Sequence, residues 1–413
     1  MIMTLFKKEC TQILKSLIFW LYVACLIFFF NSQMGNSTVL NPPQEGQENY
    51  YNYGFKTDIT EQDVMETGVG TLAYAYYYDH YVTYPVGYAK NVRISEAEKQ
   101  EIADIIYDLT GVKADEIEDN IASYFQENDI QTTQYKVPLK DGISYEQFLK
   151  DMEQVADILG PGSDYTEDRL WSNVMIPVDY EGAVENYQAL TEHDGLTGGY
   201  ARLFCDYMGI ILGILPVFVT ATRMLRDKRA QMQELIYSRG ASSGMVMGTR
   251  YAALVFMHMI PVLILSLLPT ISCITAGIED VQLDYLAWLK YDLGWLLPMV
   301  MIVVAVGMLC TELTETALAV LVQAVWWFMS VMTGASAMNG GRYGWNLIPR
   351  HNTELNYAGF AEDFGQLAMN RILYAVLALL LLALTIFIYE KKRKGHLRRR
   401  GKIFGNHKRT AEA

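Results

Sequence analysis

Between residues 31 and 200 the chain has no cysteine and few basic residues. Its five cysteines all lie outside that range, at Cys10, Cys25, Cys205, Cys273 and Cys310. The region therefore has no disulfide bonds to support it and must fold on its hydrophobic core alone. It contains 9 lysines and arginines against 31 aspartates and glutamates, whereas the rest of the chain has 24 against 15. The acidic excess would repel phosphate groups, which makes nucleic acid a poor partner, and we expect none.

Motifs that identify common enzyme classes are also missing. The sequence contains no GxxxxGK[ST] phosphate-binding loop, no HExxH zinc helix and no GxSxG nucleophile turn. His80 and His193 have no cysteine or carboxylate at the spacing of a metal site. We therefore expect no catalytic residue, no metal and no cofactor on this chain, and we do not expect it to be an enzyme.

Long apolar runs are the main positive feature of the sequence. A helix of about 17–25 residues is long enough to cross the ~30 Å hydrocarbon core of a bilayer. Six runs have this character: Ile13–Phe30, Leu203–Leu225, Tyr251–Thr275, Leu293–Cys310, Ala317–Thr333 and Ile372–Tyr389. The first run ends in three phenylalanines and has no small-residue cleavage site, so it predicts a signal anchor and not a cleaved signal peptide.

The clusters of basic residues that flank these runs all fall on the same predicted side of the membrane. They are Lys7, Lys8 and Lys15 before the first run, Arg223, Arg226, Lys228, Arg229, Arg239 and Arg250 after the second, and Lys391–Lys394 with Arg398–Arg400 after the sixth. The connection between runs three and four is acidic, with Glu279, Asp280, Asp284 and Asp292. Because cytoplasmic flanks of membrane proteins are rich in lysine and arginine, both termini are predicted to be cytoplasmic and residues 31–200 to lie outside.

The predicted fold is a polytopic α-helical membrane protein with six transmembrane helices and an α+β extracytoplasmic domain inserted between helices one and two. Residues 1–30 hold an amphipathic segment and the first helix, and residues 31–200 form the outer domain. Residues 201–390 contain helices two to six with a cytoplasmic loop at 223–250. Residues 391–413 form a basic cytoplasmic tail that contacts lipid headgroups or, alternatively, nucleic acid; the lack of interleaved aromatic residues favours lipid. A large outer domain without cysteine suits the bacterial plasma membrane.

Helix-capping signals divide the outer domain into elements. Capping boxes at Thr60–Asp63 and Ser95–Glu98 predict helices that run to about Tyr78 and Gly111. An irregular tether is predicted at 36–53, further helices at 115–125, 144–160 and 180–191, and strands at 131–139 and 174–178. Seven tyrosines fall between Tyr74 and Tyr88, either as a binding platform or, as we favour, as rings packed into the core with hydroxyl groups at the water edge.

Polar residues inside the apolar runs are few. His258 lies in the third run and Gln323 in the fifth, and both are candidate functional residues because burying a polar group in a bilayer is costly. Glu312 and Glu315 lie at the turn after the fourth run, where water solvates them. The several buried acids that a proton-coupled transporter requires are missing from this pattern, so the driving energy is expected to come from elsewhere.

The order of segments along the chain, together with the stretch 198–256, makes a more specific pattern. An amphipathic start (MTLFKKECTQILKS) precedes one apolar run, the outer domain and five further runs. The loop after the second run contains Glu234, then a short Ser/Gly segment and Arg250-Tyr251 at the start of the third run. In these features the chain resembles the permease subunits of ABC transporters of the type-2 exporter superfamily. The segment Gly344–Asn352 is similar to the outer re-entrant region of those permeases.

The resemblance implies that the loop at 223–250 forms a coupling helix that docks on a separate ATPase subunit, which would bind ATP and Mg²⁺. The residues concerned are Arg226, Lys228, Arg229, Met232, Glu234, Leu235, Ile236 and Arg239. Helical spacing places Met232, Leu235 and Ile236 near one face, with Glu234 and Arg239 available to a partner. The alternative is a solvated loop of orientation charges. The resemblance also implies a homodimer or heterodimer with a second permease, and Pro216, Pro261 and Pro269 are placed to bend helices around its path.

Two functions follow as hypotheses. The first is the permease subunit of an ATP-driven exporter, which forms the translocation path and is coupled to its ATPase through the loop. The second is a membrane receptor or sensor, without transport, whose outer domain binds a peptide or a cell-envelope ligand. An ATPase gene beside this one would favour the exporter, and a kinase gene without an ATPase gene would favour the receptor.

The predicted orientation can be tested by chemical labelling. In a cysteine-free variant, single cysteines at Asp164 and Lys290 are expected to react with a membrane-impermeant thiol reagent on intact cells, because both positions fall on predicted outer segments. Cysteines at Ser243 and Gly401 are expected to stay unlabelled. Labelling of Ser243 from outside would overturn the predicted topology.

Overall fold

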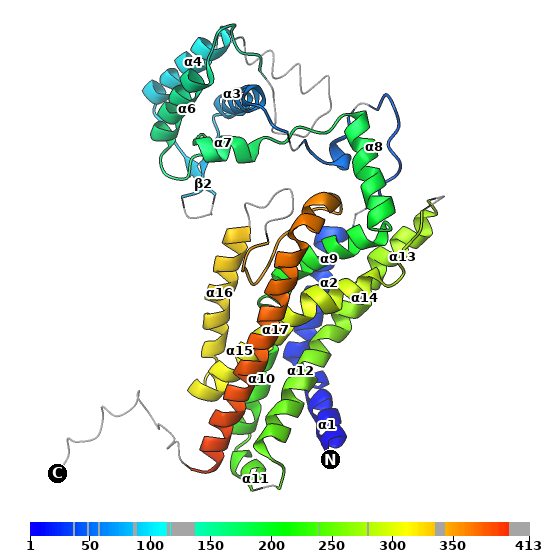
Figure 1. Ribbon diagram of the computed structural model, residues 1–413. Helices are drawn as coiled ribbons and strands as arrows, with labels where there is room; N and C mark the ends of the chain where they lie inside the picture. Colours follow the sequence, from blue (N-terminus) through cyan, green and yellow to red (C-terminus); the bar gives the residue numbers. More distant parts are fainter. Residues whose placement is uncertain are drawn as a thin grey trace, which may run out of the picture. The chain divides into compact units, whose positions relative to one another are not determined.

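The computed structural model describes residues 1–35, 38–47, 49–56, 58–85, 89–113, 116, 137–238, 240–278, 281–334 and 343–395. The chain divides into two compact units, and each is treated by itself (Figure 1). One unit consists of Met1–Pro42 and Glu185–Ala413, and the other is Pro43–Val184. The second unit falls within the range predicted for the outer domain and is shorter than that range at both ends.

The first unit is a bundle of helices. Its elements are α1 (Ile2–Leu14), α2 (Leu17–Met34), η2 (Ala189–His193), α9 (Thr197–Leu212), α10 (Leu215–Arg229), α11 (Gln233–Tyr237), α12 (Ser243–Leu265), α13 (Leu267–Ala276), α14 (Ala287–Tyr291), η3 (Asp292–Leu296), α15 (Leu297–Thr314), α16 (Leu318–Gly334) and α17 (Tyr357–Arg393). The two η elements of this unit are single π-helical turns. Each continues the helix before it, η2 extending α8 (Tyr180–Gln188) and η3 extending α14.

Among the described residues of the bundle, four stretches are long and apolar enough to cross a membrane: Leu17–Met34, Ser243–Ala276, Ala287–Thr314 and Tyr357–Arg393. Helices α9 and α10 meet this test together as a pair bent by 45°, which makes a fifth. The fifth predicted run forms the shorter apolar helix α16. The chain is thus a polytopic helical protein, but its spans are less uniform than the six predicted runs. The first begins at Leu17, and not at Ile13, because a turn at Lys15 and Ser16 separates α1 from α2.

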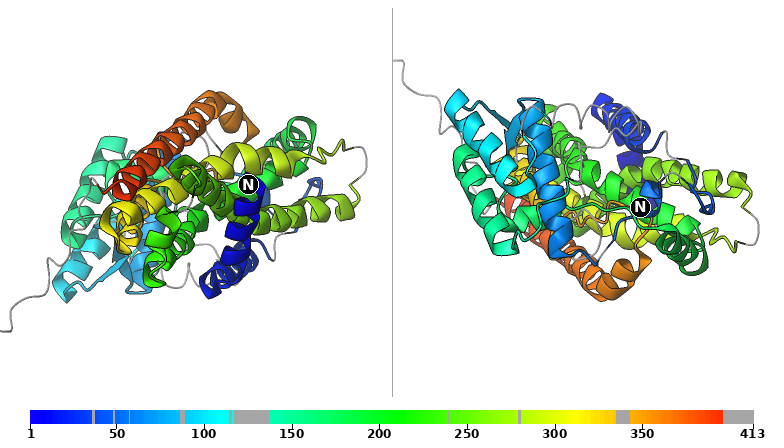
Figure 2. Two further views of the ribbon diagram at one scale, coloured as in Figure 1. Left: turned by 90° about the horizontal axis from the view of Figure 1, so that it is seen from below. Right: turned by 90° about the horizontal axis from the view of Figure 1, so that it is seen from above.

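Helix α15 lies at the centre of the bundle. It contacts α10, α12, α16 and α17, and its residues Ile302–Ala305 are completely buried. Figure 2 shows α17, α10 and α12 grouped around it when the bundle is viewed along its length. Because a helix buried on all sides must be apolar on all sides, the near-continuous sequence LPMVMIVVAVGMLC accounts for this position.

The bend between α9 and α10 is held by side chains of α16. Gly213 ends α9, and Pro216 follows in the first turn of α10, where a proline needs no hydrogen-bond acceptor. Carbonyl groups released at the bend accept hydrogen bonds from Gln323 Nε2, at 2.6 Å to Gly213, and from Trp327 Nε1, at 2.7 Å to Ile210. A broken helix in an apolar bundle is tolerated when neighbouring side chains bond its free carbonyls in this way.

The second unit is mostly helical. It contains η1 (Tyr51–Tyr53), α3 (Glu61–Tyr77), β1 (Tyr81–Thr83), β2 (Lys90–Val92), α4 (Glu96–Thr110), α6 (Tyr145–Leu159), α7 (Glu167–Asn173) and the start of α8. The two short strands pair antiparallel, with Tyr81 opposite Val92. Helices α3, α4 and α6 surround one core in which Leu72, Ile106 and Phe148 are completely buried.

The capping signals of this unit are confirmed. Both capping boxes form, because the side chains of Thr60 and Ser95 accept from the backbone N–H three residues on, and Asp63 and Glu98 accept in return. Hydrogen bonds from the Ser95 backbone N–H and hydroxyl also hold the pKa of Glu98 below its ordinary value. Gly111 ends α4 with a φ of 77°, which favours glycine.

Of the two strand predictions, the one at 174–178 is wrong and the one at 131–139 falls mostly outside the described residues. Residues 174–178 make one isolated bridge, between Pro177 and Phe55, and proline has no N–H with which to extend a ladder. Residues Val137–Leu139 form no strand, and the rest of 131–139, like nearly all of the helix predicted at 115–125, lies outside the described residues. Strand β1 comes instead from the tyrosine-rich stretch, and β2 follows that stretch. The ring of Tyr81 packs into the core as the packing interpretation expects, but its hydroxyl is buried as well and does not lie at the water edge.

The second unit provides a test of folding independence. A fragment of residues 43–184 is expected to be soluble, insensitive to reductant and cooperative in thermal unfolding, because its core is closed by its own helices. Phe148→Ala is expected to destabilise it by about 3–5 kcal/mol, since Phe148 packs directly on Gly68 and leaves a large cavity when removed. A fragment that aggregates, or one in which Phe148→Ala has no effect, would show that the core is completed elsewhere.

Candidate functional site

The short helix α11 connects α10 to α12 at one end of the bundle (Figure 1). Met232, which precedes the helix, and Leu235 within it are 43% and 50% exposed, and Glu234 between them is also exposed. Ile236 is half-buried, so the three apolar residues predicted on one face divide between solvent and protein. Arg239 lies outside the described residues. The structure thus presents two apolar side chains and one carboxylate to solvent on this helix.

The last turns of α17 hold α11 in place. The ring of Tyr389 meets the ring of Tyr237 edge-on, with centroids 5.4 Å apart. Arg393 donates from Nε to the carbonyl of Tyr237, at 3.0 Å, and from Nη1 to that of Ala241, at 2.7 Å. Ser243, which begins α12, is buried and bonds to Glu390. The exposed Ser238 is therefore a better labelling position than Ser243 for this loop.

Four charged side chains, named here the four-charge network, join the helices that flank α11 to the N-terminal helix. Glu9 of α1 accepts two hydrogen bonds of 2.7 Å from Arg223 of α10. Arg250 of α12 lies 2.6 Å from Asp227 of α10 and 3.4 Å from Glu9. Arg223 also reaches Asp227, at 3.2 Å. Two positive and two negative groups therefore alternate around one closed set of contacts.

The four-charge network is largely removed from solvent. The side chains of Arg223 and Arg250 are 4% and 5% exposed, and that of Glu9 is 12% exposed. Burying charges is costly unless each is paired and hydrogen-bonded, as these are. Arg223 binds both oxygens of Glu9 in two-pronged fashion, which fixes the relative orientation of α1 and α10 as well as their distance. Movement of α10 is thus tied to α1 and to α12.

A second set of ion pairs joins α10, α15 and α17 beside this network. Lys228 of α10 lies 2.6 Å from Glu315, and Lys392 of α17 lies 3.2 Å from the same carboxylate. Lys392 also lies 3.4 Å from Glu312 of α15. Burial alone would raise the pKa of Glu315, but hydrogen bonds from both lysines hold it below its ordinary value. Every long helix at this end of the bundle except α2 and α16 therefore takes part in one of the two sets.

The other predicted residues have separate positions. Arg226 is exposed and donates to the carbonyl of Gln12 in α1, at 3.2 Å, while Arg229 is exposed to solvent. His258 is buried in α12, where its Nδ1 lies 2.7 Å from the Leu254 carbonyl and its ring meets Tyr22 edge-on. Gln323 supports the bend described above. Neither His258 nor Gln323 contacts the four-charge network. Both residues contact neighbouring helices of the bundle, as expected of residues that support the fold.

The sequence interpretation missed the burial of several charged residues in or beside the apolar runs, and it placed one of them, Asp292, in an acidic connection. Asp206 and Asp292 are fully buried, and so is Arg202. Arg202 makes a two-pronged pair with Asp194 at 2.8–2.9 Å, and Asp206 accepts from Arg350 at 3.0 Å. Asp206 lies inside the second predicted run, and an acid in an apolar run was the signal that could have found it.

The segment Gly344–Asn352 has no helix or strand, yet Leu347, Ile348 and His351 are completely buried. Arg350 and the backbone N–H of His351 bond to Asp206 on α9, and Arg371 of α17 donates to the carbonyls of Asn346 and Leu347. Non-helical backbone inside an apolar bundle requires such partners. Asp206 and Arg371 thus bind this irregular segment to α9 and α17.

The chemistry available at α11 is that of a contact surface. Among the residues that the structure describes, no group of three or more His, Cys, Asp or Glu side chains could hold a metal ion. No protein-family model, no curated protein and no solved structure matches the chain. The arrangement itself therefore carries the functional argument: a short helix with exposed apolar side chains, bonded to the end of α17 and placed between helices that buried ion pairs join to the rest of the bundle.

The four-charge network gives a direct mutational test. Glu9→Gln leaves two buried guanidinium groups with one carboxylate, and removing one partner from a buried ion pair costs about 3–5 kcal/mol. The purified full chain is therefore expected to unfold at a clearly lower temperature. Asp284→Asn, which breaks an exposed pair with Lys290, is the control and should cost less than about 1 kcal/mol. Equal effects of the two changes would show that the network contributes no more than a solvated pair.

Proposed function

We propose that this chain is the permease subunit of an ATP-driven ABC exporter and that α11 is its contact with a separate ATPase subunit. The observation that carries the proposal is the combination of exposure and attachment at α11. Met232 and Leu235 are open to a partner, while Tyr237 and the following residues are bonded to the end of α17. An apolar anchor beside a carboxylate, on a rigid support, suits a helix that seats in a groove of another protein.

The attachments give a route for movement. A force on α11 reaches α17 through Arg393 and Tyr389, and α10 and α12 through the backbone. The four-charge network passes the displacement of α10 to α1, and the pairs around Glu315 pass it to α15. Nucleotide-driven closure of two ATPase subunits would in this way change the packing of two permeases at their interface, whether these are identical or different chains.

The remaining parts of the proposal follow from the topology. The bent pair α9–α10 counts as one span and α16 as another, which gives six spans in a bacterial plasma membrane. Both termini and α11 then lie in the cytoplasm, where an ATPase is found, and the acidic Pro43–Val184 unit lies outside as the inserted domain. ATP and Mg²⁺ belong to the partner, since this chain has no phosphate-binding loop.

A receptor without transport is the competing function. It would bind its ligand through the outer domain and would not need an exposed apolar helix fastened to the bundle at the cytoplasmic end. Substitution at α11 therefore distinguishes the two.

Leu235→Asp and Glu234→Arg are expected to leave membrane insertion intact but to abolish co-purification with the ATPase encoded beside this gene, or to uncouple its hydrolysis from transport. Charge reversal at a desolvated contact costs about 2–5 kcal/mol, whereas the same change on a solvated loop costs less than about 1 kcal/mol. Pull-down and substrate-stimulated ATPase activity of the reconstituted complex are the measurements.

Leu286→Asp is the matched control, because Leu286 is 56% exposed, much as Leu235 is, but lies on a predicted outer segment. It should behave like the wild-type chain. If both α11 variants also bind and stimulate the ATPase normally, the loop is a set of orientation charges and α11 is not the coupling contact.

A further inference from the structure

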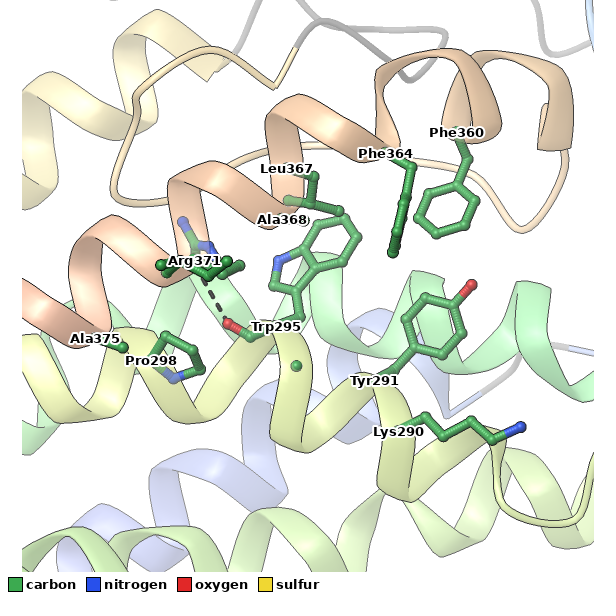
Figure 3. A pocket seen from close by; sticks show the side chains of 12 residues that line it. Lys290, Tyr291, Trp295, Pro298, Phe360, Phe364, Leu367, Ala368, Arg371 and Ala375 are labelled. Carbon is green, nitrogen blue, oxygen red and sulfur yellow. Dashed lines mark hydrogen bonds between the residues drawn. The ribbon is translucent and has the colours of Figure 1, made fainter.

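A groove of about 520 Å³ runs between the α14–η3–α15 segment and α17 (Figure 3). Its walls are mainly aromatic and aliphatic. Phe360 and Phe364 descend from α17 toward Tyr291 and Trp295, which come from the opposite segment. Pro298 and Ala375 line its other end, beyond Arg371. A groove of this size and composition accommodates a hydrocarbon chain.

The charged residues of the groove are both cationic. Arg371 lines it beside Trp295, Lys290 lies at its opposite end, and none of the 12 lining residues is acidic. Lys290 is well exposed, and its pair with Asp284 is a surface contact that contributes little. The buried acids of the neighbourhood, Asp206 and Asp292, are not among the lining residues. The groove thus offers positive charge at two places along an apolar surface.

Arg371 is buried without a counter-ion. Its guanidinium group makes five hydrogen bonds, to the carbonyls of Trp295, Asn346 and Leu347 and, twice, to the side-chain oxygen of Asn370. All of these acceptors are uncharged, and within the described parts of the chain no carboxylate lies within 4.0 Å of it. Its Nη1 has two N–H groups but one acceptor among the described residues, the Trp295 carbonyl at 3.2 Å. Carbonyl dipoles reduce the cost of burying this charge but do not neutralise it.

We propose that the groove is a binding site for an anionic phospholipid, with the phosphate at Arg371, the rest of the headgroup along the aromatic wall and an acyl chain that continues past Ile372 and Ala375 into the bilayer. Arg371 directly precedes Ile372, where the last apolar run begins, which places its charge at the boundary of the bilayer. A phosphate there would accept from Nη1 in a charge-assisted hydrogen bond and supply the missing negative charge. Tyrosine and tryptophan, which line the groove, are the side chains that favour this boundary. The inference rests on the groove alone and holds whether or not an ATPase binds α11.

Glycine positions allow the groove to be filled without disturbing the fold. Gly294 lines the groove, and a Cβ added there meets no atom within 4 Å, so Gly294→Leu projects a side chain into open space. Gly365 on α17 is equally free of contacts but does not line the groove, so Gly365→Leu is the matched control. Arg371→Gln removes the charge, while Arg371→Lys keeps it and loses the fork.

The test measures lipid binding to the full chain in detergent by native mass spectrometry, with phosphatidylglycerol and phosphatidylcholine as probes. Brominated forms of both lipids report proximity to Trp295 as quenching that Trp295→Phe removes. The wild-type chain is expected to prefer phosphatidylglycerol, and Gly294→Leu and Arg371→Gln to weaken its binding about tenfold or more, since a hydrogen bond to a charged group is lost or blocked. Arg371→Lys should retain part of the preference, and Gly365→Leu all of it.

Three results would overturn the proposal. The first is equal binding of the two lipids, and the second is unchanged binding in Gly294→Leu. The third is efficient disulfide-linked dimerisation of a Phe364→Cys variant in membranes, because a second copy of the chain would then cover the groove. If Arg371→Gln fails to fold for lack of its bonds to Asn346 and Leu347, Gly294→Leu still decides the question.

Discussion

The four-charge network of Glu9, Arg223, Asp227 and Arg250 is the interaction on which the functional account depends. It fixes α1, α10 and α12 to one another through buried, oppositely charged forks, and such contacts permit one geometry and no gradual sliding. Helix α11 is short and has few contacts of its own, so it owes its position to these neighbours and to the end of α17. A helix held in this way can pass on a displacement that a free loop would absorb.

The same physical rule operates in the rest of the bundle. At two places where the backbone leaves helical geometry, polar side chains bond the released groups: Gln323 and Trp327 at the bend of α9–α10, and Arg371 and Asp206 along the irregular segment before α17. Apolar surroundings make each unpaired carbonyl or N–H expensive, so irregular backbone and buried polar residues occur together. These polar residues need not carry chemistry. Arg371 differs from the others because its charge is left without a counter-ion among the described residues.

Local patterns in the sequence were sufficient for local structure. Thr60 and Ser95, each paired with an acid three residues on, mark the starts of their helices, and the apolar runs give most of the long helices, because both signals act within a few turns of chain. The four-charge network could not be found in this way: Glu9 and Arg223 are 214 residues apart, and each alone reads as an ordinary flanking charge. Arg371 likewise reads as the edge of an apolar run. The strand at 174–178 failed because Pro177, near its end, has no N–H with which to extend a ladder. Ile236 is half-buried because Tyr389 and Arg393 fix the orientation of α11 about its axis.

The central claim is that α11 touches an ATPase. A photo-activated amino acid placed at Leu235, in the living cell, tests it most directly, with the same residue at Leu286 for comparison. The account predicts one cross-linked product from position 235, containing an ABC ATPase chain, and none containing it from position 286. A product with a kinase, or with lipid alone, from position 235 would contradict it.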